Sequence, residues 1–330
     1  MTRNRITLVL GATGGIGGEV ARLLMARGWS VRALNRDPSR LPPSQMASGL
    51  IWRKGDAMSA ADVTAAAEGV GVIVHAVNPP GYRNWGKLVL PMLDNTIAAA
   101  RANSARIVLP GTIYNFGPDA FPNLHETTPQ NPVTVKGRIR AEMERRLQAA
   151  ASAGTPALIV RAGDFFGPRA ANNWFSQGLV QPGKPVTRVT NPGKPGVGHQ
   201  WAYLPDVAET MVRLLEKSAT LEPFAVFHMQ GHWDADGMAM MNAIRAAVGN
   251  QDIKIVGMPW PLVRLLSPFV PLFRELSEMR YLWKTPIRMD NARLRAVLGG
   301  EPHTPLATAV RETLIGLGCL AGNPEPFDRR

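Results

Sequence analysis

The sequence has few of the features that would tie a chain together covalently or hold it in a bilayer. One cysteine, Cys319, occurs among 330 residues, so no intramolecular disulfide can form, and a reducing, cytoplasmic compartment is expected. No apolar run reaches the ~20 residues that cross a bilayer, so no integral membrane segment is expected. A first apolar run starts at residue 6, which leaves no room for a signal peptide before it.

Acidic residues are also in short supply. The 25 Asp and Glu residues stand against 37 Lys and Arg, for a formal net charge of +12. The cations are scattered and no nucleic-acid-binding motif accompanies them, so no nucleic-acid partner is expected. We interpret the excess as favouring solubility and anionic small-molecule ligands. No metal site is predicted.

What the chain does have at its start is a strand, a glycine turn and a helix. Ile6–Leu10 is an apolar run of strand length, and Ser30–Leu34 is a second one after the helix. In a dinucleotide-binding unit of this order, glycines allow a tight turn, close approach of backbone N–H groups to a pyrophosphate, and close packing of helix on strand. The alternative is a tight turn without a ligand. The residues predicted to hold the phosphates are Gly11, Thr13, Gly14, Gly15, Ile16 and Gly17.

The end of the second strand discriminates between the two nicotinamide cofactors. An NAD site usually places an acidic side chain there for the ribose 2′-hydroxyl, but this chain has Asn35 followed by Arg36. A guanidinium suits a 2′-phosphate by its charge and its planar donor geometry. NADP(H) is therefore favoured over NAD(H). The alternative for Arg36 is a solvated loop cation.

Strand and helix patterns continue to alternate along the chain. This alternation predicts an α/β fold with a doubly wound parallel sheet of the Rossmann type. The carboxyl ends of such strands face the ligand crevice, so Ala76, Val77 and Asn78 are predicted to lie along the cofactor. The further strands are predicted over Leu50–Lys54, Val70–Val74, Arg106–Leu109, Ala157–Arg161 and Phe224–Met229.

The spacing of Gly11, Gly14 and Gly17, in the run G-A-T-G-G-I-G, resembles the short-chain dehydrogenase/reductase superfamily. The variant is similar to its extended and atypical branches, which include NAD-dependent epimerases and dehydratases, NmrA-like proteins and isoflavone-reductase-like enzymes. The resemblance extends over nearly the whole chain and is specific for fold and cofactor.

This resemblance implies contacts for residues after the third and sixth strands. An Asp at the place of Asp56, followed by Ala57, contacts the adenine amino group in these families. An N-cap for the next helix is an equally good interpretation of Asp56. Ala162 and Gly163 stand in a segment that flanks the nicotinamide in the extended families.

The catalytic stretch departs from the family pattern. The resemblance implies that Thr112 hydrogen-bonds a substrate carbonyl. A Tyr-x-x-x-Lys pair should follow, but Lys136 stands at the Tyr position and Arg140 at the Lys position. Tyr114 matches a different and usually structural position. Because an arginine cannot be deprotonated, Arg140 is expected to position and neutralise only.

The same stretch resembles the isoflavone-reductase-like branch, in which a Lys on this helix is the proposed acid/base. Lys136 is therefore predicted to take the Tyr role, or to anchor the nicotinamide ribose, if burial and a neighbouring cation lower its pKa. The alternative is a lysine on a solvated helix face beside an inactive site.

A smaller lobe is expected to close over the nicotinamide and supply the substrate pocket. Residues 1–168, with 199–230 returning, are predicted to form the Rossmann domain, and 169–198 with 231–330 the substrate lobe. The apolar segment 258–281 fits the core of that lobe, a substrate lid, a dimer face or an interfacial membrane anchor. The candidate substrate residues are Tyr114, Asp164, Phe165, His199 and Trp201.

These observations favour an NADP(H)-dependent oxidoreductase that acts on a small carbonyl or activated alkene. A sugar-nucleotide epimerase or dehydratase is a second interpretation, against which the loss of the Tyr counts. An NmrA-like protein that senses NADP without turnover is a third. A small-molecule substrate is the expected partner, and a homodimer stays open.

Overall fold

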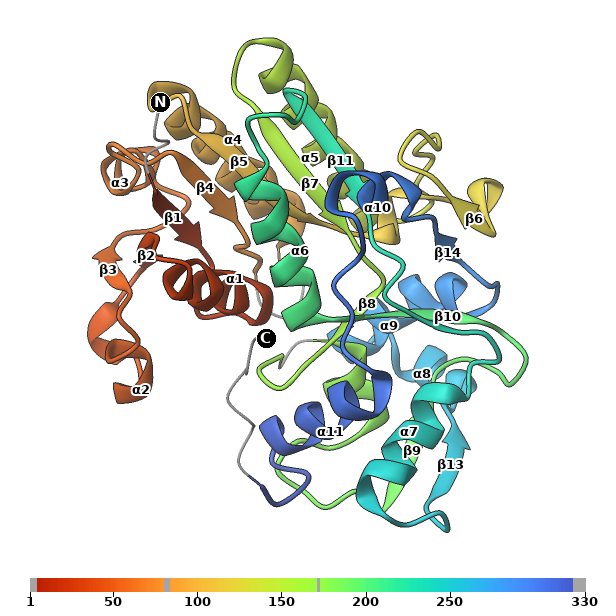
Figure 1. Cartoon of the computed structure of the whole chain (residues 1–330). Coiled ribbons are helices and arrows are strands. Elements are labelled where there is room, and N and C mark those ends of the chain that lie inside the picture. Colours follow the sequence, from red (N-terminus) through yellow and green to blue (C-terminus); the bar gives the residue numbers. More distant parts are fainter. Residues whose placement is uncertain (1–4, 80–83, 171–172, 323–330) are drawn as a thin grey trace.

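Apolar runs of the sequence form one sheet of seven parallel strands (Figure 1). The computed structural model describes residues 5–79, 84–170 and 173–322. The strand order is β11-β7-β5-β4-β1-β2-β3, which reverses direction between β1 and β4, as a doubly wound sheet does. The predicted fold class is confirmed. The strands are β1 Ile6–Leu10, β2 Ser30–Asn35, β3 Ile51–Lys54, β4 Val72–His75, β5 Arg106–Gly111, β7 Ala157–Arg161 and β11 Phe224–His228.

The two faces of the sheet pack against different helices because successive strand residues point to opposite sides. In β1, Val9 joins the core under α1 (Gly15–Ala26) and α6 (Leu204–Glu216). These two helices pack side by side (Figure 1). Leu8 and Leu10 join the core of the other face. That face is covered by α3 Ala60–Ala66, α4 Trp85–Ala102 and α5 Val135–Ser152.

A third core, rich in aromatic and Met side chains, lies under the remaining elements. Its small sheets are β12-β10-β8, β13-β9 and β14-β6. Their strands are β6 Asn123–Leu124, β8 Asp164–Phe166, β9 Arg188–Asn191, β10 His199–Tyr203, β12 His232–Asp234, β13 Lys254–Gly257 and β14 Arg288–Met289. The other α-helices are α2 Pro43–Met46, α7 Ala239–Val248, α8 Trp260–Leu266, α9 Pro271–Met279, α10 Ala292–Leu298 and α11 Leu306–Gly316.

This third core also draws on residues early in the chain. Ile113, Phe116 and Leu124 belong to it together with Met240 and Leu314. This core joins residues on both sides of the predicted domain boundary. The division into two domains stays a prediction. None of the helices in the described residues is both long and apolar enough to cross a membrane.

Two histidines are buried in strands of the main sheet. Burial, and next the charge of Arg140, lower the pKa of His75 to about 3. Burial, and next the charge of Arg161, lower the pKa of His228 to about 3. Arg161 can only donate, so its hydrogen bond to His228 Nε2, at 2.8 Å, favours the neutral ring with its proton on Nδ1.

The stability of the protein should therefore fall when the pH falls below about 6.5. Between the ordinary pKa of 6.5 and the lowered value of about 3, the unfolded chain binds protons that the folded chain does not. At pH 5 the free energy of unfolding should be lower by on the order of 2 kcal/mol for each of His75 and His228. Denaturant unfolding at pH 7, 6 and 5 measures this.

His75→Asn and His228→Asn should each reduce that pH dependence by about one proton. An equal slope in both variants and in the parent protein would contradict the assignment.

Candidate functional site

The glycine turn after β1 is built by close contacts of the backbone. Gly11 has φ +91°, and a Cβ there would lie 2.5 Å from the Ala76 carbonyl oxygen. A Cβ on Gly17 would lie 2.3 Å from the Gly11 carbonyl oxygen. A Cβ on Gly14 would meet only that same oxygen, at 3.3 Å. Packing therefore requires the first and third glycines but not the second, which fits a ligand that comes close to the backbone at Gly14.

The turn leads directly into α1, which begins at Gly15. Its N-cap residue is Gly14, which has no side chain to cap it, and its first turn has no acidic residue. Its first N–H groups and its dipole are thus available to an anion. Thr13 is exposed in the turn, and Ile16 is half-buried in the first turn of α1.

Alanine at two of these glycines should separate ligand binding from folding. Gly14→Ala should change the free energy of unfolding by less than about 1 kcal/mol. It should weaken dinucleotide binding at least about tenfold, because its methyl group stands where a pyrophosphate would approach. Gly17→Ala should instead destabilise the fold, since it forces α1 from Gly11. Thermal unfolding and titration with NADPH measure both. Unchanged NADPH affinity in a folded Gly14→Ala variant would contradict the role of the turn.

The residues predicted for the adenosine end lie at the ends of β2 and β3. Asn35 Oδ1 accepts from the Asp37 N–H at 2.9 Å, and Arg36 is exposed and makes no ion pair with the described residues. Asp56 Oδ1 accepts from the Met58 N–H at 3.0 Å. The N-cap of α3 is Ser59, so the alternative interpretation of Asp56 as that cap is wrong. Ala57, next to Asp56, is buried.

A cleft opens where β4, β5 and β7 end. It encloses about 810 Å³ of non-atom space with its open mouth included. The structure brings Thr112, Tyr114 and Arg140 together here, with Asn78 from the end of β4. Its described lining is Asn78, Trp85, Gly111, Thr112, Ile113, Tyr114, Arg140, Ala162, Gly163, Asp164, Phe165, Asn173, Trp174, Gln177 and Leu276. Ala76 and Val77, half-buried after β4, are not in this set.

Thr112 lies at the cleft end of a chain of hydrogen bonds that runs into the protein. Its hydroxyl lies 3.3 Å from Asn115 Oδ1. Asn115 Nδ2 donates to Gln130 Oε1 at 2.8 Å, and Gln130 Nε2 donates to Glu144 Oε2 at 2.8 Å. Glu144 is in turn paired with Arg161 through both oxygens.

The ion pair of Glu144 with Arg161 sets the direction of this chain of hydrogen bonds. A carboxylate can only accept, so Gln130 must present its amide N–H to Glu144 and its oxygen to Asn115. Asn115 then presents its own oxygen to the Thr112 hydroxyl, which donates. Since the Tyr114 N–H also donates to Thr112 Oγ1 at 3.3 Å, one lone pair of that hydroxyl remains for a ligand.

Lys136 does not line the cleft with Thr112 and Arg140. Its side chain is buried, and its ammonium pairs with Glu275 and lies 3.3 Å from Glu278, both on α9. The neighbours of this ammonium are thus carboxylates, whereas the predicted acid/base role needed a nearby cation. Arg140 does line the cleft, with its guanidinium carbon 5.2 Å from the centre of the Trp85 ring.

The predicted substrate residues are divided between the cleft and a second, smaller cavity. Asp164 and Phe165 line the cleft with Tyr114, whereas His199 and Trp201 line the second cavity. Asp164 and His199 connect the two, since His199 Nε2 lies 2.9 Å from Asp164 Oδ2 and both residues are buried. Trp201 is 1% exposed and packs in the third core.

The second cavity is also lined by Trp283, which the sequence did not predict. His199 lies flat on Trp283, with ring centres 3.7 Å apart and planes 7° apart. Among the described residues, no cluster of His, Cys, Asp and Glu is arranged to hold a metal ion.

Residues 7–229 match the family described as the "NAD dependent epimerase/dehydratase family". The chain belongs to this family. The match covers the whole seven-stranded sheet except its first residue, and it ends just after β11. The resemblance to the extended short-chain dehydrogenases is thereby confirmed.

Known proteins support this assignment at different depths. A "3-diazoavenalumate denitrifying reductase" from Streptomyces sp is 31% identical over 179 residues, which cover 49% of this chain and 56% of the relative, so the match spans about half of its length. The solved UDP-N-acetylglucosamine 4-epimerase from Bacillus cereus has a TM-score of 0.70 at 16% identity, with 94% of this chain and 99% of that chain covered. MoeE5 in complex with UDP-glucuronic acid and NAD has a TM-score of 0.71 at 18% identity, covering 94% and 98%. The last two show a shared fold.

Proposed function

We propose that the protein binds NADP(H) along the carboxyl edge of its sheet and exchanges a hydride with a small carbonyl or activated alkene in the cleft. The observation that carries this is the position of Thr112 in a cleft that opens at the ends of β4, β5 and β7, the edge of the sheet where the glycine turn also lies. When bound, the cofactor supplies the hydride chemistry, and the protein orients it and the substrate.

The cofactor would be held by residues at three places along this edge. Gly11 and Gly17 allow the tight turn and the close packing of α1, Gly14 would leave room for the pyrophosphate, and Arg36 would pair with the 2′-phosphate. Asp56 and Ala57 would lie at the adenine. The remaining proposed cofactor contacts are Thr13, Gly15, Ile16, Asn35, Ala76, Val77, Asn78, Ala162 and Gly163.

We assign a different role to each of the three predicted catalytic residues. Thr112 presents a lone pair, so it would orient a ligand group that carries a hydrogen, such as the hydroxyl of the alcohol form of the substrate. It would not donate to the carbonyl oxygen, as the family resemblance implied, because its own proton goes to Asn115. Arg140, which cannot give up its proton, would neutralise developing negative charge, and the proton that completes a reduction would come from water at the open mouth of the cleft. Lys136 holds α9, whose Leu276 lines the cleft, and thus acts as a positioning residue.

The charge of the cleft supports a small neutral or singly charged substrate over a sugar nucleotide. Arg140 and Asp164 are the charged side chains of its described lining, and their charges are opposite. A nucleotide diphosphate brings two negative charges, which would need more than one cation to balance them. This disfavours the epimerase interpretation for the present chain.

The absence of the Tyr-x-x-x-Lys pair favours a second candidate function, the sensing of NADP without turnover. Titration of the protein with NADPH and NADH, followed by a panel of carbonyls and activated alkenes, separates the two. Loss of NADPH absorbance in the presence of a substrate supports the reductase. Tight NADPH binding without turnover supports the sensor, and no binding of either cofactor at millimolar concentration refutes both.

A further inference from the structure

The α8 helix and the turn after it expose an unusual concentration of large apolar side chains. Leu262, Leu265 and Phe269 are 50%, 70% and 80% exposed. They are three of the eight large apolar side chains that are exposed in the described part of the chain. We call these three residues the apolar tip. This helix buries Val263 and leaves Leu262 and Leu265 exposed, so the described residues do not cover its second apolar side.

Along the sequence, the charged residues next to the apolar tip are of one sign. No acidic residue occurs between Asp252 and Glu275, a stretch that contains Lys254, Arg264 and Arg274. Arg264 is exposed in α8, and the Arg274 side chain is 65% exposed.

The nearest acidic residues along the chain point elsewhere. Glu275 and Glu278 direct their carboxylates to Lys136 on α5, and their side chains are only 16% and 26% exposed. Arg274 shares the Glu275 carboxylate with Lys136, since its Nε lies 3.7 Å from Glu275 Oε1 and Lys136 pairs with Oε2. The segment that carries the apolar tip thus has exposed apolar side chains at its centre and exposed arginines near them in the sequence, Arg264 and Arg274.

We propose that the apolar tip docks on the surface of an anionic phospholipid bilayer. Side chains such as Leu and Phe enter the boundary between head groups and acyl chains, while arginines beside them pair with lipid phosphates and anionic head groups. Such contact needs no membrane-crossing helix, and it lies outside the activity proposed for the cleft.

The same charges argue against a second copy of this chain as the occupant. A two-fold contact places each patch against itself, so Arg264 and Arg274 would face their own counterparts. The formal net charge of +12 adds repulsion between copies and attraction to an anionic surface.

Sedimentation of the full chain with lipid vesicles tests the proposal. We expect binding to vesicles of phosphatidylcholine and phosphatidylglycerol in equal parts to be on the order of tenfold tighter than to phosphatidylcholine alone, and to weaken with salt. The double change Leu265→Glu and Phe269→Glu should lower binding to the mixed vesicles at least about tenfold. Because both side chains are exposed, its thermal unfolding midpoint should not change.

A matched control carries Met46→Glu and Ile51→Glu, which alter two exposed apolar side chains at the far edge of the sheet, near β3. This control should bind vesicles like the parent protein. Failure of the parent to bind either vesicle, or equal loss in both double variants, would overturn the proposal. A dimer in solution that Phe269→Glu dissociates, without vesicle binding by the parent, would assign the apolar tip to a second copy instead.

Discussion

Glu144→Ala is expected to lower the free energy of unfolding by about 3–5 kcal/mol. Its partner Arg161 is 1% exposed and would keep a buried charge without a carboxylate. The change would also end the chain of hydrogen bonds that orients Thr112 at the cleft. Denaturant unfolding measures the loss, and a midpoint shift without a change in slope would identify it as a loss of native-state stability.

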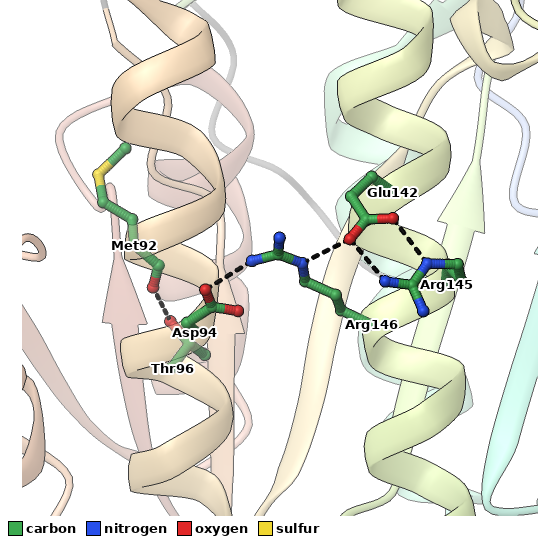
Figure 2. A network of polar contacts seen from close by, with 6 residues as sticks. All are labelled: Met92, Asp94, Thr96, Glu142, Arg145 and Arg146. Carbon is green, nitrogen blue, oxygen red and sulfur yellow. Dashed lines mark hydrogen bonds and ion pairs between the residues drawn. The ribbon is translucent and has the colours of Figure 1, made fainter.

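Glu142→Ala on the same helix is the matched control. Glu142 accepts hydrogen bonds from Arg145 and Arg146, which lower its pKa to about 2, and Arg146 also reaches Asp94 on α4 at 2.5 Å. Figure 2 shows this network between the two helices. Because it lies at the surface, where water screens the charges, its loss should cost less than about 1 kcal/mol. Equal destabilisation by the two changes would mean that burial of the Glu144–Arg161 pair has no special importance.

Arg36→Ala should lower the affinity for NADPH about 10–100-fold and leave the affinity for NADH almost unchanged. One charge-assisted interaction with a phosphate contributes roughly 1.5–3 kcal/mol, and NADH lacks that phosphate. Titration of both cofactors measures the ratio. Arg101→Ala, at an exposed cation near the end of α4, should leave both affinities unchanged. If Arg36→Ala retained full NADPH affinity, the proposal that the protein binds a nicotinamide cofactor would stand. The proposal that Arg36 selects NADPH over NADH would be wrong.

The fold was predictable because its signals are local. Most strands of the main sheet are short apolar runs, and strands such as β7 begin and end where their sequence predicts. The turn at Gly11 to Gly17 likewise carries its geometry in consecutive residues. Helices on both faces follow from the same alternation, since a parallel sheet must be covered on each side.

The interior of the site was less predictable because its contacts join distant parts of the chain. Lys136 and Glu275 are 139 residues apart in sequence, and no pattern around Lys136 indicates that two carboxylates on α9 will meet it. Asn115 and Gln130 were missed for the same reason, although Glu144 belongs to the helix stretch that drew attention to Lys136. The stacking of His199 on Trp283 depends on how two late segments pack.

The edge position of β11 bears on how the protein is made. This strand, Phe224–His228, hydrogen-bonds to β7, Ala157–Arg161, but the ribosome produces it only after the intervening segments. During translation, the edge of β7 that pairs with β11 therefore stays unpaired for on the order of seconds. Stalling of synthesis inside that interval would leave an open apolar strand edge, the kind of surface that chaperones cover and that aggregates recruit.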